Sequence, residues 1–206
     1  MQVTLLTSAA DPDSAAVAAA LERAIAADTH SPAQVKITAV ESTSSDLGMG
    51  HGAEHLLCPL TLDLSERLLE ALPTAQRALY RRCRDVADLQ QQLGQGYPVG
   101  EGDLWLPVVW TAKGPLYGEA IAAKGEDYRQ PHHLSDAQRQ PLYRLGRKLL
   151  SQLHAPPSVY LLQVACNDGV VFDRLWPFPA APALASVGVQ SPDLFACHWR
   201  CLTQQP

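Results

Sequence analysis

The stretch Ser158–Ser186 constrains the fold more than any other part of the chain. It holds two strand-like runs, joined at Asn167, Asp168 and Gly169, and then a segment rich in proline and aromatic residues. A three-residue turn with Gly169 in the left-handed conformation is a common hairpin type, and it matches residue types well across the strands. This register pairs Cys166 with Val170, Val164 with Phe172, Gln163 with Asp173 and Leu161 with Leu175. We therefore predict a β-hairpin over residues 159–176.

Both faces of the predicted hairpin are mainly apolar. One face carries Tyr160, Leu162, Val164, Cys166, Val170, Phe172 and Trp176, and only Arg174 interrupts it. The other face carries Leu161, Ala165, Val171 and Leu175 around the polar pair Gln163 and Asp173. Strands that are apolar on both faces are typical of the interior of a covered sheet. The hairpin is thus predicted to lie in the core.

The first forty residues have the pattern of a β-α-β unit. Gln2–Thr7 is a short apolar strand, and Asp11 and Pro12 suit the start of a helix that runs to about Ala27. Residues 34–41 then alternate like a second strand. A right-handed crossover makes two such strands parallel neighbours. The segment 42–52 is rich in serine, threonine and glycine, and we expect a loop and a candidate sub-boundary there.

Helices and a second group of strands follow. A short helix is predicted from Asp63 or Ser65 to Pro73, and a longer one over residues 74–93. Residues 104–111 and 115–122 form a predicted hairpin that turns at Lys113 and Gly114.

A capping box at Ser135 and Gln138 starts a helix that ends near His154. Region 104–176 is therefore β-β-α-β-β, an antiparallel sheet with the helix packed on one face. We predict an α+β fold and one domain over residues 1–206.

Composition and charge exclude several classes of protein. The chain has 206 residues, of which 47% are hydrophobic, enough for one sizeable core. The net charge of the chain is -5. Residues 77–206 are nevertheless mildly basic, because they contain thirteen basic and eleven acidic residues. This excess is too small to predict nucleic-acid binding. No apolar run approaches the roughly 20 residues of a membrane span, and the N-terminus lacks the basic start of a signal peptide. Five scattered cysteines do not form a disulfide framework, so we expect a cytoplasmic protein.

Two short motifs contain metal-ligating residue types. His51 and His55 match the H-x-x-E-H pattern of some zinc proteases, but Gly48, Gly50 and Gly52 disfavour the helix that this pattern needs. A loop with two solvated histidines is therefore the favoured interpretation.

Cys197 and Cys201 lie four residues apart and would share a face of a helix or strand. With Cys166 or a histidine they would form a small zinc site, whereas as packed thiols they are structural. The structural alternative is favoured, and no metal or other cofactor is expected.

Charged residues within the hairpin suggest an alternative small-molecule site. Asp173 and Arg174 stand in an apolar strand, where an unpaired charge is costly, so each needs a partner. Either they form a buried ion pair, or Arg174 binds an anion while His132 or His133 acts as acid or base.

A basic stripe on the helix after Ser135 offers a second place for an anion. Arg144, Arg147 and Lys148 would attract a phosphate or an acidic partner, unless they simply form a solvated helix face. The glycines at 94, 96, 100 and 102 lack the context of a phosphate-binding loop.

The segment after the hairpin is stiff and apolar. Trp176 and Phe178 stand among Pro177, Pro179 and Pro182. Such a segment either crosses the core as a strap or docks a partner protein, because preformed polyproline geometry lowers the cost of ordering.

The passage VFDRLWPFPAAPALASVGVQSPDLFACHW, residues 171–199, resembles uncharacterised conserved proteins of cyanobacteria. The resemblance covers about the last 50 residues and carries no catalytic motif. It implies a role in assembly or regulation close to photosynthesis.

No complete set of catalytic residues can be assembled from the sequence. We therefore expect a non-catalytic cytoplasmic module that binds another protein through Trp176, Phe178 and the basic helix face. The alternative is a small-molecule enzyme or an anion-binding domain with a pocket beside the 159–176 hairpin.

Overall fold

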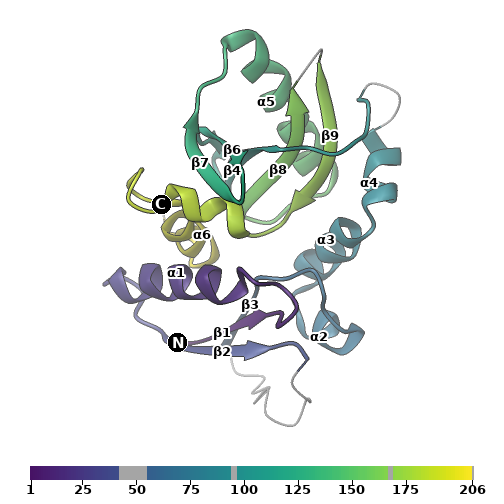
Figure 1. Ribbon diagram of the computed structural model, residues 1–206. Helices are drawn as coiled ribbons and strands as arrows, with labels where there is room; N and C mark the ends of the chain where they lie inside the picture. Colours follow the sequence, from purple (N-terminus) through teal and green to yellow (C-terminus); the bar gives the residue numbers. More distant parts are fainter. Residues whose placement is uncertain (42–54, 94–96, 167–168, 206) are drawn as a thin grey trace.

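The computed structural model describes residues 1–41, 55–93, 97–166 and 169–205, and this part of the chain forms two β-sheets with helices between and around them (Figure 1). The smaller sheet has the order β2-β1-β3, with β1 (Gln2–Thr7), β2 (Gln34–Ala39) and β3 (His55–Pro59). The larger sheet has the order β7-β6-β4-β8-β9, and β5 pairs with β4. Its strands are β4 (Leu104–Thr111), β5 (Gly114–Tyr117), β6 (Ala120–Lys124), β7 (Asp127–His132), β8 (Ser158–Cys166) and β9 (Val170–Trp176). The predicted α+β class is confirmed.

The N-terminal β-α-β unit forms as predicted. Strand β1 pairs in parallel with both β2 and β3, and α1 (Ser14–Ala27) connects β1 to β2. The helix begins at Ser14, later than the sequence indicated, because Asp11 accepts a hydrogen bond from the backbone N–H of Asp13 at 3.0 Å and closes a turn before it. The predicted loop and sub-boundary at 42–52 lie outside the described residues.

The helices after β3 are shorter than predicted. Ser65 caps α2 (Glu66–Ala71) by accepting the N–H of Leu68, and α3 (Thr74–Arg84) follows Pro73. The single long helix predicted over 74–93 is wrong, because Asp85 leaves the helical conformation with a ψ of 82°. Its carboxylate accepts the N–H of Asp88 at 3.0 Å and so starts α4 (Val86–Leu93).

Strand β4 is long enough to pair with two successive strands. Residues 108–111 pair with β5, and residues 104–105 pair with β6. The single strand predicted over 115–122 is therefore split, and β7, which the sequence did not indicate, extends the sheet beyond β6. The capping box at Ser135 and Gln138 starts α5 (Asp136–Gln152) as predicted.

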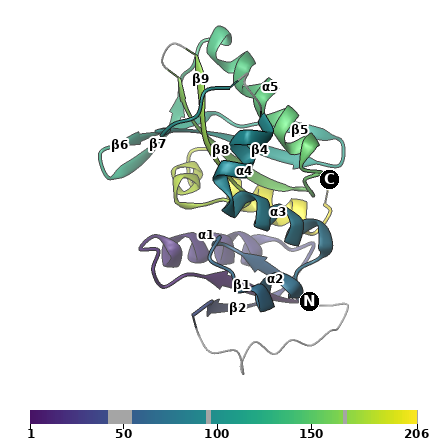
Figure 2. The same ribbon diagram turned by 90° about the vertical axis from the view of Figure 1, so that its right-hand side faces the viewer.

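A helical layer lies between the two sheets. Figures 1 and 2 show α6 (Leu194–Leu202) between α1 and the larger sheet, next to the short 3-10 helix η2 (Ala181–Ser186). Trp199 anchors this layer: its side chain is buried, and its indole N–H donates to Asp28 at 2.8 Å. No helix in the described residues is long and apolar enough to cross a bilayer.

The larger sheet divides the apolar core in two. Trp105 of β4 and Leu161 of β8 face α1, α6 and the smaller sheet. Leu106 of β4 and Leu162 of β8 face the opposite side, where Leu145 of α5 packs on them.

The hairpin of β8 and β9 has the predicted register only near its turn. Cys166 pairs with Val170, and Val164 pairs with Phe172. A β-bulge then inserts Asp173, so that Gln163 faces Arg174 and Leu161 faces Trp176. The predicted pairs of Gln163 with Asp173 and Leu161 with Leu175 are wrong. Because one extra residue reverses the faces beyond it, Arg174 and Trp176 lie on the side of Gln163.

Candidate functional site

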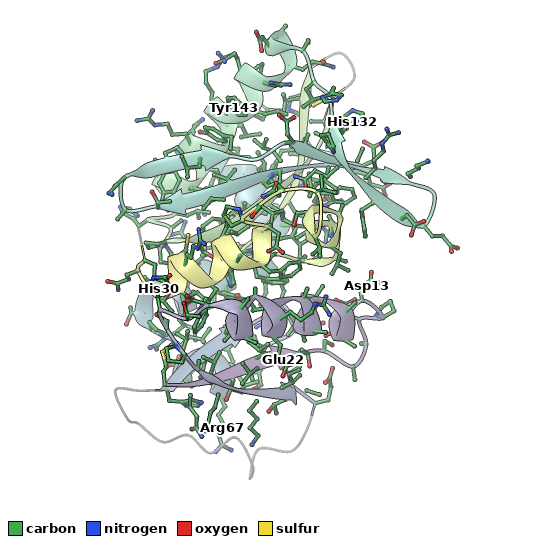
Figure 3. All side chains as sticks on the ribbon, turned by 90° about the vertical axis from the view of Figure 1, so that its left-hand side faces the viewer. Asp13, Glu22, His30, Arg67, His132 and Tyr143 are labelled. Atoms are coloured by element: carbon green, nitrogen blue, oxygen red, sulfur yellow. The ribbon has the colours of Figure 1, made fainter. Side chains whose placement is uncertain are left out.

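A cleft of about 620 Å³ lies where the two sheets face each other. The segments that follow β1 and β3 form one side, and the larger sheet with the segment after β9 forms the other. Ligands of sheets with parallel strands commonly bind beyond the carboxyl ends of those strands, which is where this cleft lies. Figure 3 shows Asp13 on this side, at the N-terminal end of α1. The polar and aromatic lining of the cleft consists of Asp11, Asp13, Thr61, Asp63, Arg84, Trp105, Tyr128, Gln163, Arg174, Trp176 and Phe178.

Arg174 is held so that part of its guanidinium group remains for a ligand. Its Nε donates to Asp173 at 3.1 Å, and its guanidinium carbon lies 5.6 Å from the centre of the Trp176 ring. Within the described residues its two terminal nitrogens have no hydrogen-bond partner, and 40% of the side chain is exposed. A guanidinium group fixed on one edge presents its remaining N–H groups in the fork geometry that suits carboxylate and phosphate.

Asp173 is turned away from the cleft. It is only 8% exposed, and its second carboxylate oxygen accepts the backbone N–H of Gly102 at 3.0 Å. The bulge residue therefore orients Arg174 and is not available to a ligand.

Gln163 and Trp176 support Arg174 from the same face. The indole N–H of Trp176 donates to the Gln163 carboxamide oxygen at 2.9 Å, and the Gln163 amide nitrogen donates to the Gly102 carbonyl at 2.7 Å. Both ends of the carboxamide are thus used, which fixes the Trp176 ring beside the guanidinium group.

The opposite side of the cleft is acidic. Asp11, Asp13 and Asp63 line it. Tyr128 packs edge-on against Trp105, with 5.3 Å between the ring centres. It lies close enough to Asp11 and Asp13 for their negative charges to affect its pKa. Burial raises the pKa of Tyr128, and the negative charges of Asp13 and Asp11 raise it further. The phenol therefore stays protonated at neutral pH and can donate a hydrogen bond into the cleft.

Two further polar side chains of the cleft, Arg84 and Trp105, differ in whether their hydrogen-bond donors have partners. Arg84 donates to the carbonyl of Leu64 at 3.0 Å, so part of its hydrogen-bonding capacity is used within the protein. Trp105 is 7% exposed, and in the described part of the chain its indole N–H has no partner. Such an unsatisfied buried donor is unusual in a folded protein.

The histidines proposed as acid or base are far from Arg174 in the sheet. His132 lies on β7 and His133 follows it, whereas Arg174 is on β9 at the opposite edge of the larger sheet. Both histidines are exposed, and neither lines the cleft. The predicted grouping of His132, His133, Asp173 and Arg174 does not form.

The basic stripe of α5 lies on the other face of the larger sheet. Arg144, Arg147 and Lys148 are exposed, while the buried face of α5 packs on the side opposite the cleft. Lys148 donates to the carbonyl of Leu93 at 3.3 Å and lies over the ring of Tyr97. The stripe and Arg174 therefore form separate surfaces.

The metal-ligand candidates are not brought together. His51 lies outside the described residues, and His55 contacts the hydroxyl of Thr4 at 2.9 Å. On α6, the thiol of Cys197 donates to Pro192 and that of Cys201 donates to Trp110. Among the described residues, no three His, Cys, Asp or Glu side chains lie close enough to hold a metal ion.

The proline-rich segment is a strap across the core. Phe178 is 2% exposed and stacks on Tyr80 with 6.2 Å between ring centres. Trp176 packs edge-on against Phe178 at 6.0 Å and lines the cleft. Phe178 is therefore too buried to take part in the expected partner-docking surface, whereas Trp176 is half-buried and open to the cleft.

A buried Ser-His-Cys group was not anticipated from the sequence. The two ring nitrogens of His198 lie 3.1 Å from the hydroxyl of Ser158 and 3.5 Å from the thiol of Cys58. Burial lowers the pKa of His198 to about 3 and raises that of Cys58 to about 12. A nucleophile needs an accessible thiolate or an activated hydroxyl, so this buried neutral group is structural.

Solved structures share this fold. N5-carboxyaminoimidazole ribonucleotide synthetase from Thermotoga maritima has a TM-score of 0.71 and 8% identity, covering 100% of this chain and 76% of that chain. L-amino acid ligase from Bacillus licheniformis has a TM-score of 0.66 and 9% identity, covering 98% and 74%. Carboxyaminoimidazole ribonucleotide synthase from Aspergillus clavatus, complexed with ATP, has a TM-score of 0.65 and 11% identity, covering 100% and 77%. No family model matches the sequence, and no curated protein sequence matches it.

The fold is therefore ATP-grasp-like, as in these three solved structures, whose names are those of a synthetase, a ligase and a synthase. The expectation of a non-catalytic binding or assembly module, and of a protein that is not an enzyme, is overturned by these likenesses. The alternative of a small-molecule site beside the hairpin is the better supported of the two.

The two sides of the cleft fit different kinds of ligand group. Arg174 offers free N–H donors to a phosphate, as described above. Mg²⁺ needs oxygen ligands in octahedral geometry, usually one or two carboxylates in addition to phosphates. The hairpin side of the cleft presents a carboxamide that is already bonded, an indole and a guanidinium group. These groups do not fit a divalent cation, whereas Asp11, Asp13 and Asp63 on the opposite side are carboxylates of the kind that bind Mg²⁺.

Proposed function

We propose that the protein is a small-molecule enzyme that binds an anionic substrate in the cleft between its two sheets. The observation that carries the proposal is the state of Arg174, which is fixed by Asp173 and Trp176 while its terminal nitrogens point to no protein acceptor among the described residues. The likeness to ligases and synthetases supports an enzyme of that broad class.

The cleft divides its chemistry between two sides. Arg174 binds and orients the anion, and Trp105, Trp176 and Tyr128 provide apolar walls that exclude water. Across from them, Asp13 and Asp63 supply carboxylates that can accept a proton from a substrate amine or hydroxyl. A cytoplasmic location is part of the proposal, since all five cysteines are free.

Replacing Arg174 with methionine should weaken anion binding and leave the fold intact. Methionine keeps the apolar stem but removes the charge, and a hydrogen bond to a charged group is worth about 1.5–3 kcal/mol. We expect the dissociation constant for a bound anion to rise by about 10- to 100-fold. Isothermal titration calorimetry, after a thermal-shift screen of phosphate, pyrophosphate, ADP, ATP and short carboxylates, measures this change.

Arg144→Met is the matched control, because Arg144 is an exposed arginine on the other face of the sheet. It should bind the same anion as tightly as the wild type. Equal loss in both variants, or no loss in Arg174→Met, would contradict the proposed role of Arg174. A screen in which no anion binds would contradict the proposed function.

A further inference from the structure

We infer that a second pocket, between α1 and α6, binds a small organic anion. This pocket has a volume of about 420 Å³ and shares no lining residue with the cleft. Its volume lies within the range of ordinary small-molecule sites. Figure 3 shows how far the two sites are separated along α1: Asp13, which lines the cleft, lies at one end of the helix, and His30, which lines the pocket, lies at the other. The inference therefore goes beyond the proposed function and does not depend on Arg174.

Each of the two helices presents one arginine and small side chains to the pocket. On α1, Arg23 lies three residues after Ala20 and four before Ala27, and all three line the pocket. On α6, Arg200 lies four residues after Ala196, and both line the pocket. Residues at these spacings share a helix face. The small alanine side chains thus leave space between the helices for a ligand that both arginines can reach.

The first carboxylate of the lining, Asp28, is used within the protein. It accepts hydrogen bonds from the indole N–H of Trp199 at 2.8 Å, from the amide of Gln205 at 2.7 Å and from the backbone N–H of His30 at 3.0 Å. The ring of His30 also lies 3.5 Å from the same carboxylate. Trp199 is 1% exposed, so these bonds fix a rigid wall of the pocket.

The second carboxylate, Asp193, caps α6. It accepts the backbone N–H of Ala196 at 2.8 Å, at the end of the helix where the dipole favours a negative charge. The guanidinium groups of Arg23 and Arg200 have no hydrogen-bond or ion-pair partner in the part of the chain that the structure describes, and both residues are exposed. The two arginines are thus the charged groups of the pocket whose donors remain for a ligand.

The lining also indicates what kind of anion fits. Guanidinium groups present their N–H donors in a fork that matches the oxygens of phosphate and carboxylate. Beside them the pocket is apolar, since Val187 and Pro192 join the alanines, and Val187 is 41% exposed. An inorganic anion would leave these apolar side chains in water. The ligand class is therefore an anionic head group on a short apolar body.

Nuclear magnetic resonance titration of the full-length Arg174→Met protein tests the inference, because this variant weakens the anion site of the cleft. The probes are phenyl phosphate and inorganic phosphate, which is the head group alone. We expect phenyl phosphate to shift the backbone amide signals of Ala24 and Ala196, which lie on the two walls of the pocket. It should bind about tenfold more tightly than inorganic phosphate, since part of its ring is buried against apolar side chains.

Variants in the same background identify the arginines that bind the probe. Adding Arg23→Met or Arg200→Met should weaken the binding of phenyl phosphate by about tenfold each. Arg67→Met is the matched control, because Arg67 is an exposed arginine that lines neither site, and Figure 3 shows it far from α6. It should bind as the parent does. Arg200 lies in the last turn of α6, where a positive charge favours the helix. Circular dichroism and the urea midpoint therefore accompany each variant, and Arg23→Met alone decides if Arg200→Met is unfolded.

The outcomes separate this inference from the proposed function. Amide signals of Ala24 and Ala196 that do not shift with either probe would overturn the inference and leave the anion site of the cleft untouched. Equal affinity in Arg23→Met and Arg67→Met would also overturn it. If inorganic phosphate binds as tightly as phenyl phosphate, the organic class of the ligand is wrong. Loss of anion binding to the cleft in Arg174→Met, with the pocket signals still shifting, would support both sites.

Discussion

Gly102→Ala is expected to destabilise the protein by about 3 kcal/mol, because a larger side chain cannot be accommodated there without moving backbone. A Cβ atom at this position would lie 2.5 Å from the carbonyl carbon of Val164 and 2.6 Å from its oxygen. Val164 belongs to β8, whose pairing with β4 and β9 prevents it from retreating. The midpoint of urea unfolding, at unchanged denaturant dependence, measures the loss.

The same substitution should weaken the cleft. Gly102 donates to Asp173 and accepts from Gln163, so displacing it disturbs both side chains that orient Arg174 and Trp176. Gly146→Ala is the control, since a Cβ there would meet Val108 at an ordinary 3.5 Å within the helix α5. The control should be neutral or slightly stabilising. A Gly102→Ala protein with wild-type stability and anion affinity would show that this contact does not position the hairpin.

Lowering the pH from 7 to 5 is expected to reduce the free energy of unfolding by about 2 kcal/mol through His198 alone. Its pKa is about 3 in the folded protein, because burial disfavours the charged ring, and 6.5 is the ordinary value for an unfolded chain. Between these values the unfolded state binds the proton and the folded state does not. The stability is therefore complete above about pH 6.5 and is lost as the pH falls through that value towards 3.

Urea unfolding at pH 5 and pH 7 in the wild type and in His198→Gln measures this contribution. Glutamine removes the titrating group and can keep polar contacts to Ser158 and Cys58, so the difference between the two pH values should shrink by about 2 kcal/mol even if the variant is less stable. The exposed His133→Gln should retain the wild-type difference. An unchanged difference in His198→Gln would refute the assignment. Hydrogen bonds, mainly from Gln205 to Asp28 and from Ser8 to Glu41, lower the pKa values of these two carboxyl groups. The stability that they add to the folded protein is lost only at more acidic pH.

Local patterns in the sequence predicted much of the fold. The β-α-β unit, the capping box of α5 and the turn end of the β8–β9 hairpin depend on residues close in the chain, and these predictions are confirmed. The division of the helix at Asp85 was missed because a side-chain cap overrode a continuous helical pattern. Strand β7 was missed because its sequence, DYRQPH, is polar and its pairing with β6 is what makes it a strand.

The candidate site was only partly predictable. Arg174 could be singled out because a charge in an apolar strand needs an explanation. Its neighbours could not, since the cleft gathers segments after β1 and β3, the start of α4, and the larger sheet. The apolar segment at Trp176 and Phe178 looked like a docking surface because the sequence does not reveal that Tyr80 covers it. The resemblance to cyanobacterial proteins remains a prediction.

The bulge at Asp173 decides which face of the larger sheet Arg174 and Trp176 occupy. In a regular ladder with the same residues, Gln163 would pair with Asp173 and Leu162 with Arg174, so Arg174 and Trp176 would point towards the core under α5. Deleting Asp173 would keep Arg174 opposite Gln163, but it would remove the carboxylate that accepts the Arg174 Nε and the Gly102 N–H. The position of one extra residue in β9 thus determines whether the strand presents an arginine to the cleft.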